Sequence, residues 1–182
     1  ILNSSNLQGT NLKARLGPNA SFSQPPKIEK NATGESIRFD GRMACQITSE
    51  LASVNRYLPT REMTVEAWAG IDEAQPWGGI IGILQDNGPA ERGWILGYDE
   101  HTFYFGLSTE GADDGDGNMT YLRAKTRYEP GKFYHVVGIY DGTVMQIYVN
   151  GKPEGESVTQ HGAILYPADA AFVIGAYQDQ DE

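Results

Sequence analysis

The stretch FYHVVGIYDGTVMQIYVNGKP, from Phe133 to Pro153, indicates the fold more clearly than any other part of the chain. Two β-branched and aromatic segments are separated by Asp141-Gly142, and Asn150-Gly151 follows the second segment. Asp-Gly and Asn-Gly tolerate the positive φ angles of tight hairpin turns, so this stretch predicts a three-stranded antiparallel meander. Apolar and polar residues alternate from position 145 to position 150. One face of the middle strand is therefore expected to be buried, and the other to meet water or a ligand.

The composition favours one all-β domain. The chain has 182 residues, with 22 glycines, 9 prolines and 10 tyrosines, and no long helical pattern. The net charge of −10 disfavours nucleic acids and anionic membranes as partners, because both would repel it. No apolar run reaches the length of a membrane span, so no membrane insertion is expected. These features suit an extracellular, cation-binding protein.

A strand pattern at 37–47 indicates one long strand or a strand pair bent at Gly41, and further strand patterns occur at 63–71, 79–84, 94–98, 102–108, 119–125 and 171–175. Residues 1–30 are polar and predict an irregular arm with one short strand near 12–16. Cys45 lies on the apolar side of its strand, which favours a buried structural thiol. Ten to twelve short strands separated by turns predict a two-sheet antiparallel sandwich within a single domain covering 1–182.

Four ordered motifs resemble the concanavalin A-like lectin/glucanase superfamily, particularly its laminin G-like and pentraxin branches. They are Phe39-Asp40-Gly41, Thr64–Trp68, Phe133–Lys152 and Val173-Ile174-Gly175. The resemblance implies a jelly-roll sandwich of two curved sheets. Such domains usually end with one more strand, which this chain lacks before Glu182. We therefore expect a fragment of a larger protein, with the closing strand missing and an open sheet edge near residues 36–48.

An acidic loop is the first candidate metal site. The hairpin expected between the two loops should bring the segment 110–118 to the same end of the sandwich as Asp86-Asn87. Asp114, Asp116 and Asn118 place oxygen-bearing side chains at alternate positions, separated by glycines. This spacing suits calcium, which takes six to eight oxygen ligands, although the loop lacks the length and terminal Glu of an EF-hand.

The resemblance implies a second, overlapping set of calcium ligands. Pentraxins carry them in a Gln-Asp-Asn loop and in a Gly-x-x-Gln-Asp segment, which match Asp86 and Asn87 and then Gln178 and Asp179. Tyr177 stands where that family has a further acidic ligand, which departs from its two-calcium arrangement. A third alternative is a solvated acidic rim that holds no ion.

Aromatic side chains are the candidates for ligand binding. Trp77 lies in a loop flanked by Pro76 and Gly78-Gly79, so it is expected to be exposed and able to stack on a sugar ring. Tyr104 is the second candidate, if its strand lines a concave sheet. Most other aromatic residues are expected in the core, and the three isolated histidines are expected to be structural.

The carboxylates do not predict catalysis. Glycosidases on this fold place an acid and a nucleophile together on one strand. Glu66, Asp72 and Glu73 do not have that spacing. We therefore expect a non-catalytic, calcium-stabilised recognition or adhesion module, extracellular or in the cell envelope or periplasm, which binds a carbohydrate or an extracellular protein. The alternatives are a glycoside hydrolase on the same fold and a structural accessory domain of a larger exoenzyme.

Overall fold

The predicted meander forms one sheet of a β-sandwich. The computed structural model describes residues 21–25, 27–31, 34–48, 51–87 and 90–177. The strands β10 (Phe133–Tyr140), β11 (Met145–Val149) and β12 (Lys152–Ser157) pair in antiparallel fashion. Asn150 and Gly151 have φ angles of 50° and 76°, as a tight hairpin turn requires. The strand β5 (Met63–Gly70) pairs with the other side of β10, which gives the order β12-β11-β10-β5.

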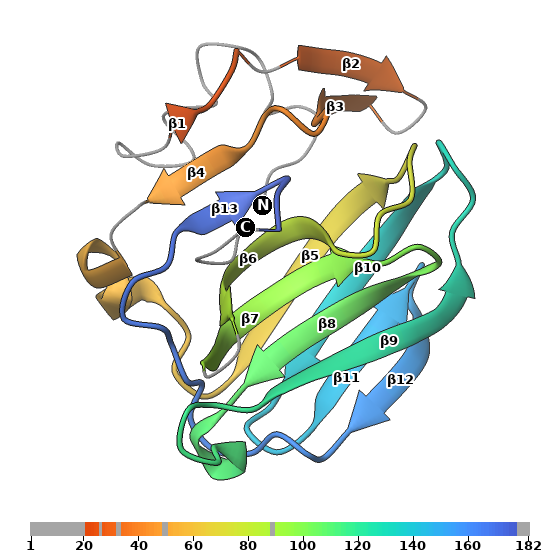
Figure 1. Ribbon diagram of the computed structural model, residues 1–182. Coiled ribbons are helices and arrows are strands. Elements are labelled where there is room, and N and C mark those ends of the chain that lie inside the picture. Colours follow the sequence, from red (N-terminus) through yellow and green to blue (C-terminus); the bar gives the residue numbers. More distant parts are fainter. Residues whose placement is uncertain (1–20, 26, 32–33, 49–50, 88–89, 178–182) are drawn as a thin grey trace.

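The second sheet has seven strands in the order β1-β4-β13-β6-β7-β8-β9 and packs against the first (Figure 1). Its strands are β1 (Ser21–Phe22), β4 (Cys45–Thr48), β13 (Phe172–Ile174), β6 (Gly78–Asp86), β7 (Glu91–Tyr98), β8 (Thr102–Ser108) and β9 (Met119–Arg127). A separate hairpin joins β2 (Lys27–Asn31) to β3 (Gly34–Arg38). Short 3₁₀ turns lie at Leu51–Ser53, Asn55–Tyr57 and Glu110–Ala112. None of the helices in the described ranges is long and apolar enough to cross a membrane.

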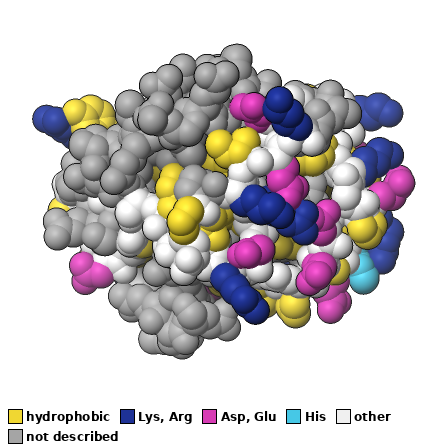
Figure 2. All heavy atoms as spheres, turned by 90° about the horizontal axis from the view of Figure 1, so that it is seen from above, with side chains coloured by type: hydrophobic (Ala, Val, Ile, Leu, Met, Phe, Trp, Pro, Cys, Tyr) yellow, Lys and Arg dark blue, Asp and Glu magenta, His cyan; other side chains and the backbone are white. Residues whose placement is uncertain are grey.

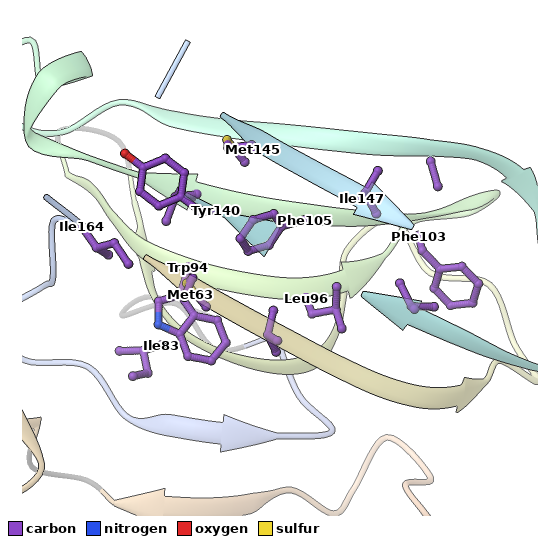
Figure 3. Packing of buried hydrophobic residues seen from close by; sticks show 14 of the residues in the cluster. Met63, Ile83, Trp94, Leu96, Phe103, Phe105, Tyr140, Met145, Ile147 and Ile164 are labelled. Atoms are coloured by element: carbon purple, nitrogen blue, oxygen red, sulfur yellow. The ribbon is translucent and has the colours of Figure 1, made fainter. Parts of the chain in front are cut away.

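The main core lies between the two sheets. Phe103, Phe105 and Leu107 of β8 are fully buried there, together with Ile147 of β11. Figure 3 shows Phe103, Phe105 and Ile147 in the same interior layer as Trp94 and Met145. Because side chains alternate along a strand, the intervening residues of the seven-stranded sheet face the opposite way. Four of them form a second apolar cluster on that outer face, namely Leu84, Ile95, Tyr104 and Met119. The all-β sandwich is confirmed.

The N-terminal part decides between the two alternatives for 37–47 and changes the expectation for the arm. A strand pair is present, because β3 and β4 are separate strands in different sheets and Gly41 between them has a φ of 76°. The arm expected to be irregular up to residue 30 contains β1 and most of β2, while the strand expected near 12–16 lies outside the described residues.

The open edge is not at β4. Since β1 and β13 flank β4 on both sides, the expectation of an unpaired edge is wrong for Cys45–Thr48. Among the described strands, β5 and β12 are the outer strands of the four-stranded sheet. A closing strand remains a prediction.

The surface carries charges of both signs despite the net charge of −10. On the described part of the face seen in Figure 2, acidic and basic side chains are intermixed, with hydrophobic side chains between them. The described side chains of this face therefore form no extended patch of one sign.

Candidate functional site

Aromatic rings gather on the outer face of the seven-stranded sheet. Trp77, directly before β6, has its ring centroid 6.0 Å from Tyr104, 5.2 Å from Tyr121 and 5.8 Å from Tyr177. We call these four side chains the aromatic platform. Gly97 makes room for it, since a Cβ there would lie 2.5 Å from the Cζ atom of Tyr104. Trp77 is 41% exposed, so the platform presents one indole ring to solvent.

A shallow hollow of about 330 Å³ lies beside this indole, lined by Pro76, Trp77, Asp99, Glu100, His101 and Arg123. The Arg123 guanidinium carbon lies 5.9 Å from the Trp77 ring centroid, and its Nε donates to Asp99 Oδ2 at 2.9 Å. Burial raises the pKa of Asp99, but hydrogen bonds from the backbone N–H groups of Thr102 and His101, together with Arg123, outweigh burial and lower it. The hollow thus combines an aromatic plane with a fixed cation and a fixed carboxylate.

The structure separates the two predicted ligand-binding residues. Trp77 is exposed, as expected, and it lines the hollow. Tyr104 is fully buried, and its hydroxyl donates to the Gly78 carbonyl at 3.3 Å. Burial also raises its pKa. Tyr104 therefore supports Trp77 from beneath, which corrects the expectation that its ring meets a ligand directly.

Asp86 ends β6 and is held by two tyrosines. Its Oδ2 accepts hydrogen bonds from the hydroxyls of Tyr121 and Tyr177, the latter at 3.3 Å. Burial, and then the hydrogen bond to Asp86, raise the pKa of Tyr121, so its phenol remains a protonated donor. The neighbouring Asn87 Oδ1 accepts from Gln85 Nε2 at 3.4 Å. The tyrosines were not predicted as site residues.

The acidic loop lies at the predicted end of the sandwich. Glu91, the first residue of β7 and the partner of Asp86, forms a bridge with Gly117. Its N–H donates to the Asp116 carbonyl at 3.1 Å, and its Oε2 accepts from Met119 N at 2.6 Å. The expectation that strand order brings the two loops to one end is confirmed, and Glu91 is the residue that fixes the second loop.

The side chains of this loop are only partly arranged for a cation. Asp113 Oδ1 accepts from two backbone N–H groups of the loop at 2.8 and 2.9 Å, and these bonds lower its pKa. Asp114 and Asp116 are exposed. The backbone carbonyl of Asn118 accepts a hydrogen bond from Nε2 of the buried Gln160 at 2.8 Å, so this residue is positioned through its main chain.

The pentraxin-like calcium set does not fit the described residues. Two O–H donors take Asp86 Oδ2, and Tyr177 supplies one of them at the position where the resemblance has an acidic ligand. Gln178 and Asp179 lie outside the described residues. Within the described ranges, no group of three or more His, Cys, Asp or Glu side chains could hold a metal ion. Calcium at the Asp114–Asn118 loop stays a prediction.

A second aromatic surface lies on the outer face of the four-stranded sheet. Trp68 is 60% exposed and stacks on its cross-strand partner His135, with centroids 5.1 Å apart. His135 Nε2 lies 3.1 Å from Glu66 Oε2. Asp72 forms an ion pair with Arg38 at 2.8 Å. Glu66 and Asp72 are thus engaged with neighbours, and none of the three carboxylates considered for catalysis, Glu73 included, is among the residues that line the Trp77 hollow.

Comparisons with known proteins agree with this fold. A laminin G-type family model, described as the concanavalin A-like lectin/glucanases superfamily, matches residues 46–182. Pappalysin-1 from Mus musculus is 29% identical over 123 residues, which is 60% of this chain and 7% of that protein. Pappalysin-1 from Homo sapiens matches to the same extent. The chain thus spans a small part of the length of these relatives.

Two solved structures share the fold at low sequence identity. One is domain 4 of AbnA, a GH43 extracellular arabinanase from Geobacillus stearothermophilus, in complex with arabinotriose. It has a TM-score of 0.56 and 11% identity, covering 88% of this chain and 75% of that one. The other is the binding domain of Paraclostridial Mosquitocidal Protein 1, with a TM-score of 0.59 and 9% identity, covering 90% and 40%. Because the family model spans most of the residues that form the sandwich, the chain belongs to the concanavalin A-like lectin/glucanase superfamily.

Proposed function

We propose that this chain is a non-catalytic recognition domain that binds a glycan at the hollow beside Trp77. The observation that carries the proposal is the exposed indole, packed on the aromatic platform and flanked by Arg123 and Asp99. An aromatic plane can stack on the apolar face of a sugar ring. The guanidinium and the carboxylate can exchange hydrogen bonds with sugar hydroxyls, and Asp99 is held charged for this role.

The same carboxylate argues against hydrolysis. A glycosidase needs two carboxyl groups across the scissile bond, and its general acid needs a raised pKa. The pKa of Asp99 is lowered instead, and its Oδ2 is tied to Arg123 at 2.9 Å. Glu66 lies on the other sheet and pairs with His135. These positions support binding without turnover.

The likeness to known proteins supports a similar setting. The structure of the AbnA domain contains arabinotriose, and the mosquitocidal protein domain is itself named a binding domain. We propose that this chain is likewise a binding part of a larger extracellular or cell-envelope protein. A protein ligand is the second candidate, favoured by the exposed Trp68 on the opposite sheet. Calcium at Asp114, Asp116 and Asn118 is proposed to stabilise the rim.

The test is a glycan array followed by titration calorimetry on the best binder. Trp77→Ala should weaken binding at least about tenfold, which corresponds to about 1.4 kcal/mol. Trp68→Ala is the matched control, since it removes an exposed tryptophan from the other sheet, and it should bind normally. A reducing-sugar assay on the same glycan should show no release. Unchanged affinity in Trp77→Ala, or turnover by the wild type, would contradict the proposal.

A further inference from the structure

The geometry points to Asp86 as a positioning residue for recognition. We propose that its carboxylate accepts hydrogen bonds from the hydroxyls of Tyr121 and Tyr177 and thereby fixes the two rings that pack beneath Trp77. We call Asp86, Tyr121 and Tyr177 the clamp, and we propose that it takes the place of the calcium ion that the resemblance implies here. The inference rests on the proposed function, because it assigns the residues that orient the exposed indole.

The clamp joins segments that are far apart in the sequence. Asp86 ends β6, while Tyr121 belongs to β9 and lies 35 positions away. Tyr177 follows β13 and lies 91 positions from Asp86. The two hydroxyl oxygens are 3.2 Å apart and both bond to Asp86 Oδ2. One carboxylate oxygen thus connects the end of β6 with both tyrosines.

The clamped rings are the ones on which Trp77 rests. Its indole is tilted by 53° against Tyr121 and by 40° against Tyr177. Two glycines make these approaches possible. A Cβ at Gly79 would lie 1.8 Å from the Ala176 carbonyl oxygen, and one at Gly106 would lie 3.1 Å from the Tyr121 ring. The hydroxyl contacts therefore fix the rings, and the rings fix the tilt of the indole.

The chemistry of the clamp differs from that of a calcium site. Calcium requires six to eight oxygen ligands, chiefly carboxylates, carbonyls and water. Tyr121 and Tyr177 instead bring O–H groups that donate to Asp86 Oδ2. A phenol proton and a cation cannot both occupy the same side of one carboxylate oxygen. The hydrogen bonds at Asp86 Oδ2 therefore hold the two tyrosines without needing a metal ion.

The first test follows Trp77 directly, without any ligand. The three tryptophans are labelled with 5-fluorotryptophan, and the fluorine NMR signal of Trp77 is assigned through Trp77→Phe. Asp86→Ala and Tyr177→Phe should shift or broaden the Trp77 signal, and leave that of the buried Trp94 in place. Asp116→Ala is the control from the same rim and should leave the Trp77 signal unmoved.

A conservative variant separates hydrogen bonding from metal binding. Asp86→Asn keeps a carbonyl acceptor for the phenols but loses the charge that calcium needs. It should return the Trp77 signal close to its wild-type position. The wild-type spectrum should be the same in chelator and in millimolar calcium. A Trp77 signal that moves with calcium in the wild type but not in Asp86→Asn would overturn the inference.

Affinity for the glycan is the second readout. Asp86→Ala should bind about tenfold more weakly, while Asp86→Asn should bind nearly as the wild type does. If the clamp variants leave both the Trp77 signal and the affinity unchanged, the clamp is refuted although the proposed function can stand. If they move the signal but the wild type binds no glycan, the clamp stands and the proposed function fails.

Discussion

Glu154 should be worth more to the stability of this protein than its position near the surface suggests. It lies on β12, an outer strand of the four-stranded sheet, and reaches β9, an outer strand of the seven-stranded sheet. Its Oε2 accepts from the backbone N–H groups of Lys125 and Thr126 at 2.8 and 2.7 Å. Its Oε1 accepts from Thr126 Oγ1 at 2.9 Å. One carboxylate therefore ties the two sheets together along this side.

Glu154→Ala should lower the free energy of unfolding by about 1.5–3 kcal/mol, the value of one hydrogen bond to a charged group. The expected loss of free energy is smaller than the sum of the three hydrogen bonds, because water can reach the freed N–H groups at this half-exposed site. For a domain of this size the loss corresponds to a melting temperature lower by about 3–12 °C. Glu156→Ala, on the same strand and exposed, is the control and should change stability by less than about 0.5 kcal/mol.

The pH dependence provides a second check on Glu154. Burial raises its pKa, but the bonds from Thr126 and Lys125 outweigh burial, and the net pKa lies below the ordinary 4.5. A lowered carboxylate pKa stabilises the fold above the unfolded-state value, and this stability is lost as the pH falls through the folded-state value. The difference between the wild type and Glu154→Ala should therefore be full at pH 7 and shrink in acid. Equal urea midpoints for Glu154→Ala and Glu156→Ala at pH 7 would refute the reasoning.

Two further predictions concern the candidate site. Millimolar calcium should raise the melting temperature relative to chelator, by the equivalent of about 2.7 kcal/mol at a hundredfold excess over Kd. Asp116→Ala should lose this increase in melting temperature, and Asp86→Ala should keep it. An unchanged melting temperature of the wild type in calcium would contradict the prediction and indicate an acidic rim that holds no ion. Asp99→Asn should destabilise the fold at neutral pH, because the lowered pKa of Asp99 means that its bonds stabilise above its unfolded-state value. In urea titrations the gap to the wild type should close as the pH falls through the folded-state pKa of Asp99. A gap that is constant with pH would contradict a charged Asp99.

The fold was predictable because its signals are local. The turns at Asp141-Gly142 and Asn150-Gly151, and the alternation in β11, depend on neighbouring residues, and they predicted the meander correctly. Strand order alone also placed the acidic loop beside Asp86. Alternation tells which face of a strand a side chain occupies, but not what covers that face. This is why Tyr104 was expected at the surface and is fully buried.

The remaining parts of the site depend on contacts between distant segments. Tyr177 reaches Asp86 across 91 positions, and Glu154 reaches Thr126 across 28. No spacing rule links such pairs. The split of the 37–47 pattern into β3 and β4 has the same origin, because partners elsewhere in the chain decide which sheet receives each half. The sequence contains Gly97 and Gly79, but it does not indicate that they allow the close approach of Tyr104 and of the segment at Tyr177.

The place of β13 between β4 and β6 has a consequence for biosynthesis. On the ribosome, β6 to β9 can pair with one another as they emerge, since each follows the previous one directly in the sequence and is its neighbour in the sheet. β4 leaves the ribosome much earlier, yet one of its neighbours is Phe172–Ile174. Until those residues are synthesised, β4 cannot pair with β13, which connects it to β6 and the rest of the seven-stranded sheet. Its unpaired backbone groups can then pair with other nascent chains. Chaperone capture during translation is therefore expected to concentrate on the N-terminal quarter of the domain.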